Sequence, residues 1–305
     1  MRRGLSSEAN FGPPRLLEGD ATMNDANHTY LDRIIADHRA RALADQRSVE
    51  QLLAEATLLP ETRGFRSCLT QPELSVIAEI KRRSPSKGDL FAGLDPATLA
   101  REYAAGGASC ISVLTDEENF GGSREDLEKA RSAVQLPVLR KDFTVHERDV
   151  LDARLMGADA VLLIVAALSK QELKRLFFLS RDLGLDALVE THDEAELETA
   201  LDIGADLVGV NQRNLVTFDV DHERATRMGG LIPAEVVAVA ESGVRGKSDA
   251  VALRQAGYAA ILVGETLVTS GDPRAALAAL RAVSYTHLRA HETSLHLVCR
   301  LLLEK

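Results

Sequence analysis

The sequence predicts a (β/α)8 barrel preceded by a helical extension, and three observations support this fold class. Eight short apolar runs alternate with amphipathic stretches over about 210 residues, a length typical of such a barrel. Each run is rich in Val, Ile or Leu and lacks strict alternation, as expected of strands buried on both faces. No G-x-G-x-x-G motif follows any run, which disfavours the alternative of an open Rossmann-like sheet. The runs are 74–80, 110–114, 136–139, 160–166, 187–189, 207–210, 236–239 and 259–263.

The stretches between the runs carry helix start and stop signals. Asp95 followed by Pro96 predicts an N-cap and a proline at the first helical position. Thr191 and Glu194 have the spacing of a capping box. Gly257 stands where a helix end needs a left-handed residue. We therefore expect one helix after each strand.

The chain divides into four segments by composition and pattern. Residues 1–22 lack periodicity and are expected to form a disordered leader. In the predicted extension, 23–74, the amphipathic stretch 30–56 should form one or two helices on the barrel, which itself covers 75–282. The tail 283–305 resembles a translated sequencing-adapter read-through, and we expect it to be an artefact rather than a genuine extra helix.

Overall composition excludes several classes of function. The net charge of −10 argues against a nucleic-acid or anionic-membrane surface. No apolar run reaches the length of a membrane span and no signal-peptide core is visible, so a cytoplasmic location is expected. The three cysteines show no metal or redox spacing, and no metal site is predicted.

Charged residues stand at the ends of the first and third runs, where barrel enzymes place their chemistry. Glu79 and Lys81 share one side of the first strand and can face into the barrel, although a surface ion pair is the alternative. Lys141 follows the third run, where crowding by other cations could depress its pKa towards general-acid work. A solvated surface lysine is equally compatible with that position.

Further candidates follow the fifth and sixth runs. Glu190 is placed to act as a base or proton shuttle, or alternatively as a carboxylate favoured by a helix dipole. Asn211 and Arg213 supply an amide and a guanidinium, or else form an ordinary turn.

Small residues after the last two runs predict an anion site. Glu241-Ser242-Gly243 and Gly264-Glu265 let backbone N–H groups approach a phosphate, at the two strands where barrels commonly bind one. A phosphorylated small-molecule ligand is therefore expected. Three histidines lack ligand spacing and are interpreted as structural or surface residues: His146, His192 and His222.

Several of these segments together resemble the indole-3-glycerol-phosphate synthase family. The resemblance covers about residues 29–282 and is most specific in the first and third segments. It departs from the usual pattern in the loop 143–147 and at Gln212, which puts only the detail of the substrate loop in doubt. The matching segments are 76–88, 112–116 with 120–123, 137–143, 188–190, 211–215 and 241–243.

The resemblance implies ring closure of carboxyphenylamino-deoxyribulose phosphate to indole-glycerol phosphate, with release of CO2 and water and without a cofactor. It implies that Lys141 protonates the ketone oxygen, that Lys81 holds the benzoate carboxylate, and that Glu190 removes a proton during dehydration. Glu79 and Asn211 would orient the lysines and the sugar hydroxyls. The phosphate would be bound by Ser84, Arg213, Ser242, Gly243, Gly264 and the backbone of Glu265, with Glu241 supporting this floor.

Two rival functions remain at this point. A phosphoribosylanthranilate isomerase, another phosphate-binding barrel, would be expected to use a cysteine and an aspartate, yet Cys110 opens a strand rather than following one. A barrel that only binds ligands is disfavoured by the joint presence of Lys81, Lys141 and Glu190. Protein partners and oligomeric state cannot be predicted.

Overall fold

A computed structural model describes the fold of the chain. The predicted leader 1–22 and tail 283–305 lie outside the described residues, so those two predictions stay open. Within the part that is described, no helix is both long and apolar enough to cross a bilayer. The described residues are 29–84, 87–91, 93–214 and 219–282.

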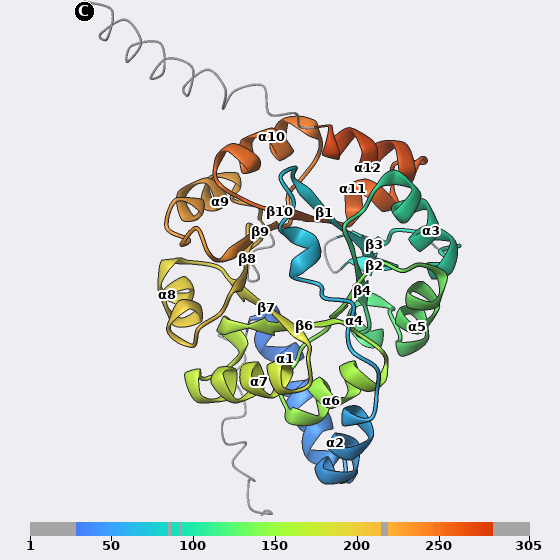
Figure 1. The fold of residues 1–305 in the computed structure, drawn as a ribbon, viewed down its shortest axis with the longest axis vertical. Helices are drawn as coiled ribbons and strands as arrows, with labels where there is room; N and C mark the ends of the chain where they lie inside the picture. The colour runs from blue at the N-terminus through green and yellow to red at the C-terminus, as the bar shows by residue number, and fades with distance from the viewer. Residues whose placement is uncertain (1–28, 85–86, 92, 215–218, 283–305) are drawn as a thin grey trace, which may run out of the picture.

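Parallel strands close into a barrel, which confirms the predicted fold class (Figure 1). Closure is made by the first strand, which pairs with the last strand on one side and the second barrel strand on the other. Every predicted apolar run overlaps one of these strands. The barrel strands are β1 (Ser75–Ile80), β4 (Cys110–Leu114), β5 (Val138–Lys141), β6 (Ala160–Ile164), β7 (Asp186–Thr191), β8 (Leu207–Asn211), β9 (Val237–Glu241) and β10 (Ala260–Val263). A small antiparallel pair, β2 (Arg83–Ser84) and β3 (Gly88–Asp89), follows β1.

Helices surround the barrel on its outer face (Figure 1). Asp95 caps the first of them as predicted, since its side chain accepts from the Thr98 N–H at 3.0 Å. The predicted capping box at Thr191 is wrong, because this residue still belongs to β7 and its hydroxyl donates to the Gly209 carbonyl at 2.9 Å. Asp193 is the cap instead. The surrounding helices are α3 (Pro96–Gly106), α5 (Arg124–Ala133), α6 (Glu147–Leu155), α7 (Lys170–Asp182), α8 (Glu194–Asp202), α9 (His222–Gly229), α10 (Lys247–Gln255) and α12 (Pro273–Arg281). The short helices α4 (Glu117–Phe120) and α11 (Glu265–Val268) and the 3-10 turn η2 (Val165–Ala167) directly follow β4, β10 and β6.

The extension before the barrel forms two helices, α1 (Tyr30–Ala44) and α2 (Val49–Thr57), as the amphipathic pattern predicted. Thr29 and Asp32 form a complete capping box at the start of α1. The helix α2 packs against α6 on the outside of the barrel. A 3-10 turn, η1 (Ser67–Leu69), then leads into β1.

Strand alternation separates the apolar core into two parts. One set of side chains faces outward and packs under the helices, and it includes Val76, Ala78 and Val113. The other set fills the barrel interior, where Phe65 and Leu69 from the segment before β1 join inward residues of the strands. The amino-terminal half of the barrel is therefore a packed core, and only its opposite end is left for chemistry.

Candidate active site

A cavity of about 410 Å³ lies at the carboxyl ends of the barrel strands. Every residue that the sequence singled out for the site lines this cavity, although the residues come from six different barrel strands or the loops after them. The structure therefore brings the predicted residues together in one place. They are Glu79, Lys81, Ser84, Lys141, Glu190, Asn211, Arg213, Glu241, Ser242, Gly243, Gly264 and Glu265.

Strand periodicity explains why these side chains point inward. Along β9, Val237 and Val239 belong to the barrel interior, so Glu241, two residues further, faces the same way at the open end. On β5 the same relation joins Leu139 to Lys141. Both strands thus change from apolar to charged inward residues at their last position.

Two glycines leave room for the inward carboxylates. A Cβ at position 209 would lie 2.0 Å from Oε1 of Glu241, and a Cβ at position 264 would lie 2.4 Å from Oε1 of Glu79. A methyl group at either position would displace the carboxylate, because real Cβ atoms essentially never approach within 3.0 Å of another heavy atom. Gly209 and Gly264 are therefore needed by their neighbours' carboxylates and not by a turn.

Lys141 lies between two carboxylates on the cavity floor. Its Nζ is 2.9 Å from Oε2 of Glu241 and 3.3 Å from Oε2 of Glu190. The other oxygen of Glu190 accepts a hydrogen bond of 3.0 Å from the amide of Asn211. These contacts hold the ammonium group and the Glu190 carboxylate in fixed orientations, because each has a second anchor.

The prediction that cations depress the pKa of Lys141 is wrong for this structure. Burial alone lowers the pKa, but the charges of Glu241, Glu190 and Glu79 outweigh it and raise the pKa above its ordinary value. Lys141 is therefore fully protonated at neutral pH. The neighbouring strand ends supply carboxylates rather than the expected ammonium groups, and Lys81 is itself paired.

The two carboxylates beside Lys141 have opposite shifts. Burial raises the pKa of Glu241 to about 7, although Lys141 opposes this, and Glu190 adds to the rise. Burial also acts to raise the pKa of Glu190, but Lys141, His192 and the Asn211 hydrogen bond outweigh it and lower the pKa. Glu190 is thus the ionised member of the pair, and Glu241 holds a proton part of the time near neutrality.

The second lysine also carries its own carboxylate. Nζ of Lys81 lies 2.7 Å from Oε1 of Glu79, whose side chain is only 6% exposed. The alternative of a surface ion pair is therefore excluded for these two residues. Their pair presents a positive group to the cavity from β1.

The loop after β9 has the backbone shape of an anion cradle. Ser242 and Gly243 both have positive φ, 65° and 74°, and such consecutive residues can turn their N–H groups towards one point. The side chain of Gln212 donates to the Ser242 carbonyl at 2.8 Å and holds this loop. The unusual glutamine noted in the sequence therefore has a structural role. Opposite it, Glu265 pairs with Lys87 from the loop after β1.

Sequence reasoning missed one wall of the cavity, which is built by α1. Tyr30, Leu31 and Ile34 line it from this helix, and Phe120 and Phe143 line it from the barrel loops. Ring centroids of the two phenylalanines lie 6.3 Å apart. The amphipathic pattern of α1 indicated a packed face, but no local signal indicated which part of the barrel it would cover.

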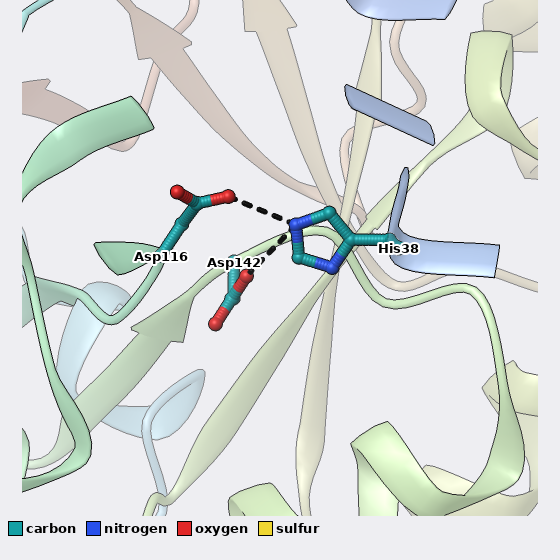
Figure 2. A group of neighbouring side chains, drawn as sticks. All are labelled: His38, Asp116 and Asp142. Atoms are coloured by element: carbon teal, nitrogen blue, oxygen red, sulfur yellow. Dashed lines mark hydrogen bonds and ion pairs between the residues drawn. The ribbon is translucent and has the colours of Figure 1, made fainter. Parts of the chain in front are cut away.

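A buried group of three polar side chains connects α1 to this wall (Figure 2). Nε2 of His38 lies 2.9 Å from Asp116 and 3.9 Å from Asp142, and its ring lies 5.2 Å from that of Phe143. These three ligand-type residues are close enough to hold a metal ion. Their carboxylates, however, already accept from protein donors, among them the Asn119 N–H at 2.7 Å and the Phe143 N–H at 2.8 Å. Together these interactions favour a docking contact for α1 over a metal site.

Two of the three histidines interpreted as structural or surface residues are part of the site region. His222 lines the cavity, where the loop after β8 leads into α9. His192 is largely buried, with Nε2 at 3.4 Å from Oε1 of Glu190. His146 does cap α6, since its ring accepts from the Arg148 N–H at 3.1 Å. Spacing along the chain could not find the first two, because their neighbours come from other strands.

Fold and cavity place the chain among the (β/α)8 barrels whose strand ends bring lysine and carboxylate groups together in one cavity. The family model described as indole-3-glycerol phosphate synthase matches residues 31–280, and the chain belongs to this family. Enzymes of this name are carboxy-lyases. The resemblance on which the family was predicted is thereby confirmed.

Curated relatives carry the same name. Indole-3-glycerol phosphate synthase 2 of Streptomyces coelicolor is 51% identical over 235 residues, which are 77% of this chain and 90% of the relative. The synthase of Paenarthrobacter aurescens is 55% identical over 210 residues, 69% of this chain and 77% of that one. At these identities the chain and its relatives share one fold over the aligned residues.

Solved structures of lower identity show the fold alone. Thiamine phosphate pyrophosphorylase from Pyrococcus furiosus has a TM-score of 0.53 at 18% identity and covers 69% of this chain and 95% of its own. The N-acetylmannosamine-6-phosphate 2-epimerase from Clostridium perfringens has a TM-score of 0.54 at 13% identity, with coverage of 67% and 91%. The barrel is thus common to enzymes with different reactions, and the reaction must be argued from the site.

Proposed function

We propose that this cavity closes the ring of carboxyphenylamino-deoxyribulose phosphate to give indole-glycerol phosphate, CO2 and water. The observation that carries the proposal is the Lys141 ammonium group, held at 2.9 and 3.3 Å by Glu241 and Glu190 at the centre of the cavity floor. An ammonium group that is charged at neutral pH has the proton that the substrate's ketone oxygen needs as the aromatic carbon attacks.

In the ring-closing step Lys141 gives its proton to the ketone oxygen, and a carbon–carbon bond forms at the ring carbon that carries the carboxylate. The bond to that carboxylate then breaks, and its electron pair restores the aromatic ring as CO2 leaves. No cofactor is required as an electron sink. Lys81, held at 2.7 Å by Glu79, would bind the benzoate carboxylate beforehand. The negative charge that develops on the ketone oxygen thus meets the preplaced ammonium group of Lys141.

In the dehydration step a proton leaves carbon and a hydroxide leaves as water. Glu190 is suited to take the proton, because its lowered pKa keeps it ionised and Asn211 fixes its orientation at 3.0 Å. Lys141, after it has recovered a proton, would supply the acid for the leaving hydroxyl. Glu241 holds Lys141 at 2.9 Å through both steps, and Asn211 is in reach of the sugar hydroxyls as well.

The two ends of the substrate fit the two ends of the cavity. Phe120, Phe143 and the apolar residues of α1 form a wall for the aromatic ring. The phosphate would lie on Ser242, Gly243, Gly264 and the Glu265 backbone, with Ser84 and Arg213 beside it. Positive φ at Ser242 and Gly243 supports this placement.

Location and segment boundaries belong to the same proposal. A substrate that carries a phosphate and a carboxylate does not cross bilayers unaided, so we propose that the enzyme works in the cytoplasm, where phosphorylated sugars are made. The working unit is the barrel 75–282 with its helical extension 23–74, because α1 completes the cavity wall. Neither nucleic acid nor a membrane is needed for this reaction.

A turnover assay tests the proposal directly. The purified protein is given carboxyphenylamino-deoxyribulose phosphate, and the fluorescence of the indole product is followed; product formation is expected. Phosphoribosylanthranilate is offered in parallel, and no isomerisation is expected, because Cys110 is fully buried at the opposite end of the barrel near the Phe65 carbonyl. Isomerisation without indole formation would overturn the proposal, and so would the absence of any turnover.

A further inference from the structure

His192 is a largely buried histidine that directly follows β7 and lies behind Glu190. Its side chain is 13% exposed. Glu196, in the first turn of α8, accepts from both the backbone N–H of His192 at 2.7 Å and its Nδ1 at 3.0 Å through one carboxylate oxygen. This double contact fixes the ring and requires the proton on Nδ1.

The free edge of the ring is turned towards the proposed base. Nε2 of His192 lies 3.4 Å from Oε1 of Glu190, the same oxygen that accepts from Asn211. This nitrogen is buried and has no hydrogen-bond partner among the residues that the structure describes. The contact is therefore an ion-pair contact that operates when Nε2 also carries a proton. His192 does not line the cavity, so it acts through Glu190 and not on the substrate.

The charges around the ring favour its protonated form. Burial alone lowers the pKa of His192, but the Glu196 hydrogen bond and the charges of Glu190, Glu196 and Glu241 outweigh burial and raise the pKa. These groups come from β7, α8 and β9. On the far side of Glu190, the ammonium group of Lys141 contacts the other oxygen of this carboxylate. The pKa of Glu190 is in turn lowered by His192.

We propose that His192, held by Glu196, is a positioning residue for Glu190. Its positive charge keeps this carboxylate ionised and holds Oε1 on the side away from Lys141, which contacts only Oε2. The inference rests on the proposed function of Glu190 as the base of the dehydration step. Without the second cation, Glu190 would share the single charge of Lys141 with Glu241. A proton would then stay on Glu190 at a higher pH, and the base would be blocked.

Two substitutions remove the charge without enlarging the site. His192→Gln keeps a donor near Glu190 but no titrating ring, and Glu196→Gln keeps an acceptor for the backbone N–H while removing the anion that holds the ring charged. Loss of an opposite charge at this distance raises a carboxylate pKa by about one unit or more. The acid limb of the kcat profile should therefore move up by about one pH unit in His192→Gln, and in the same direction in Glu196→Gln, with KM unchanged.

Glu194→Gln is the matched control, because Glu194 lies in the same first turn of α8 and is exposed. Its pH profile should coincide with that of the wild type. In the double variant of positions 192 and 196, the acid limb should shift no further than in His192→Gln alone. Both substitutions act by removing the same positive charge, that of the His192 ring. Circular dichroism checks folding, and if His192→Gln does not fold, Glu196→Gln decides the matter alone.

A ring NMR titration without substrate gives a second readout. The pKa of His192 should lie above its ordinary range in the wild type and fall in Glu196→Gln, but not in Glu194→Gln. A neutral His192 at pH 7, an unmoved acid limb in the folded variants, or a rise in KM with kcat unchanged would each overturn the inference. Absence of indole formation by the wild type would contradict the proposed function instead, and the titration would still show whether Glu196 holds a charged ring.

Discussion

Each end of the barrel buries a carboxylate, and the two carboxylates differ in how their oxygens are bound. Asp159, before β6 at the amino-terminal end, is fully buried; it accepts the N–H groups of Arg63 and Val138, each at 2.8 Å, and pairs with Arg131. Glu241, at the opposite end, is 1% exposed and meets Lys141 with one oxygen. Its other oxygen has no hydrogen-bond partner among the described residues.

The difference separates a structural carboxylate from a working one. A buried carboxylate whose oxygens all have hydrogen-bond or ion-pair partners stabilises one conformation. A buried carboxyl group with an oxygen that lacks a hydrogen-bond partner has a raised pKa and can exchange a proton. The same alternation of β-strands produced both ends. One end packs Phe65 and Leu69 into the interior, and the other opens into the cavity.

Lys141→Met should have the largest effect on activity. Loss of the general acid should lower kcat by about 10²-fold or more, measured by indole fluorescence. Lys174→Met is the control, since Lys174 is exposed on α7; it should keep normal turnover. A kcat near that of the wild type in Lys141→Met would remove this residue from the acid role.

Phe65→Ala tests the closed end. Phe65 is fully buried in the barrel interior, so the cavity left by truncation should lower the free energy of unfolding by about 3–5 kcal/mol. Turnover at a temperature where the variant is folded should stay near that of the wild type. Phe178→Ala, at a phenylalanine that is 44% exposed, should cost less than about 1 kcal/mol. Equal losses in the two variants would contradict the described packing.

Glu241→Gln should change how stability depends on pH. The pKa of Glu241 is about 7 in the folded chain against an ordinary 4.5, so between these values the folded state keeps a proton that the unfolded state releases. Wild-type stability should therefore fall as pH rises through this window, relative to the variant, by up to about 3 kcal/mol. Denaturant titrations at several pH values measure the difference, and a constant difference would contradict the raised pKa.

Ser242→Asp should weaken substrate binding more than it disturbs folding. A carboxylate on the proposed phosphate floor repels the phosphate, and KM should rise about tenfold or more at low salt, equivalent to about 1.4 kcal/mol. Ser242→Asn is the control, because Asn also tolerates the positive φ of 65° but is neutral. If both variants keep the wild-type KM, the phosphate binds elsewhere.

Removal of residues 283–305 should have the smallest effect. Leu277 and Leu280 of α12 are buried and complete the outer ring of helices before this segment begins. Turnover and melting temperature should both stay close to those of the full chain. Deletion from residue 273, which also removes α12, should lower the melting temperature strongly. A comparable loss on the shorter deletion would show that the segment packs on the barrel.

Most of the candidate site could be predicted from the chain because a parallel barrel relates sequence position to place in a simple way. The carboxyl ends of the barrel strands all face the same cavity. Lys141 and Glu190 could therefore be assigned to one site without knowing the distance between their side chains. The reaction required the family resemblance in addition. Position alone left Lys141 undecided between an acid and a surface residue.

Predictions failed where a local pattern had more than one possible partner. Thr191 has the spacing of a capping residue, but β7 continues through it and its hydroxyl bonds to Gly209 on the neighbouring strand. The pKa of Lys141 was predicted from the wrong neighbours, because which charges meet at the strand ends depends on register around the barrel.

The sequence by itself determined the strands, their inward faces and the end of the barrel that carries the chemistry, because hydrophobic periodicity and strand polarity act locally along the chain. Only the tertiary structure decided that α1 forms a cavity wall, that His38 meets Asp116, and that His192 lies beside Glu190. These contacts join residues that are far apart in the chain or turned by a loop. Their charges and pKa values follow from distances in space, which no spacing in sequence specifies.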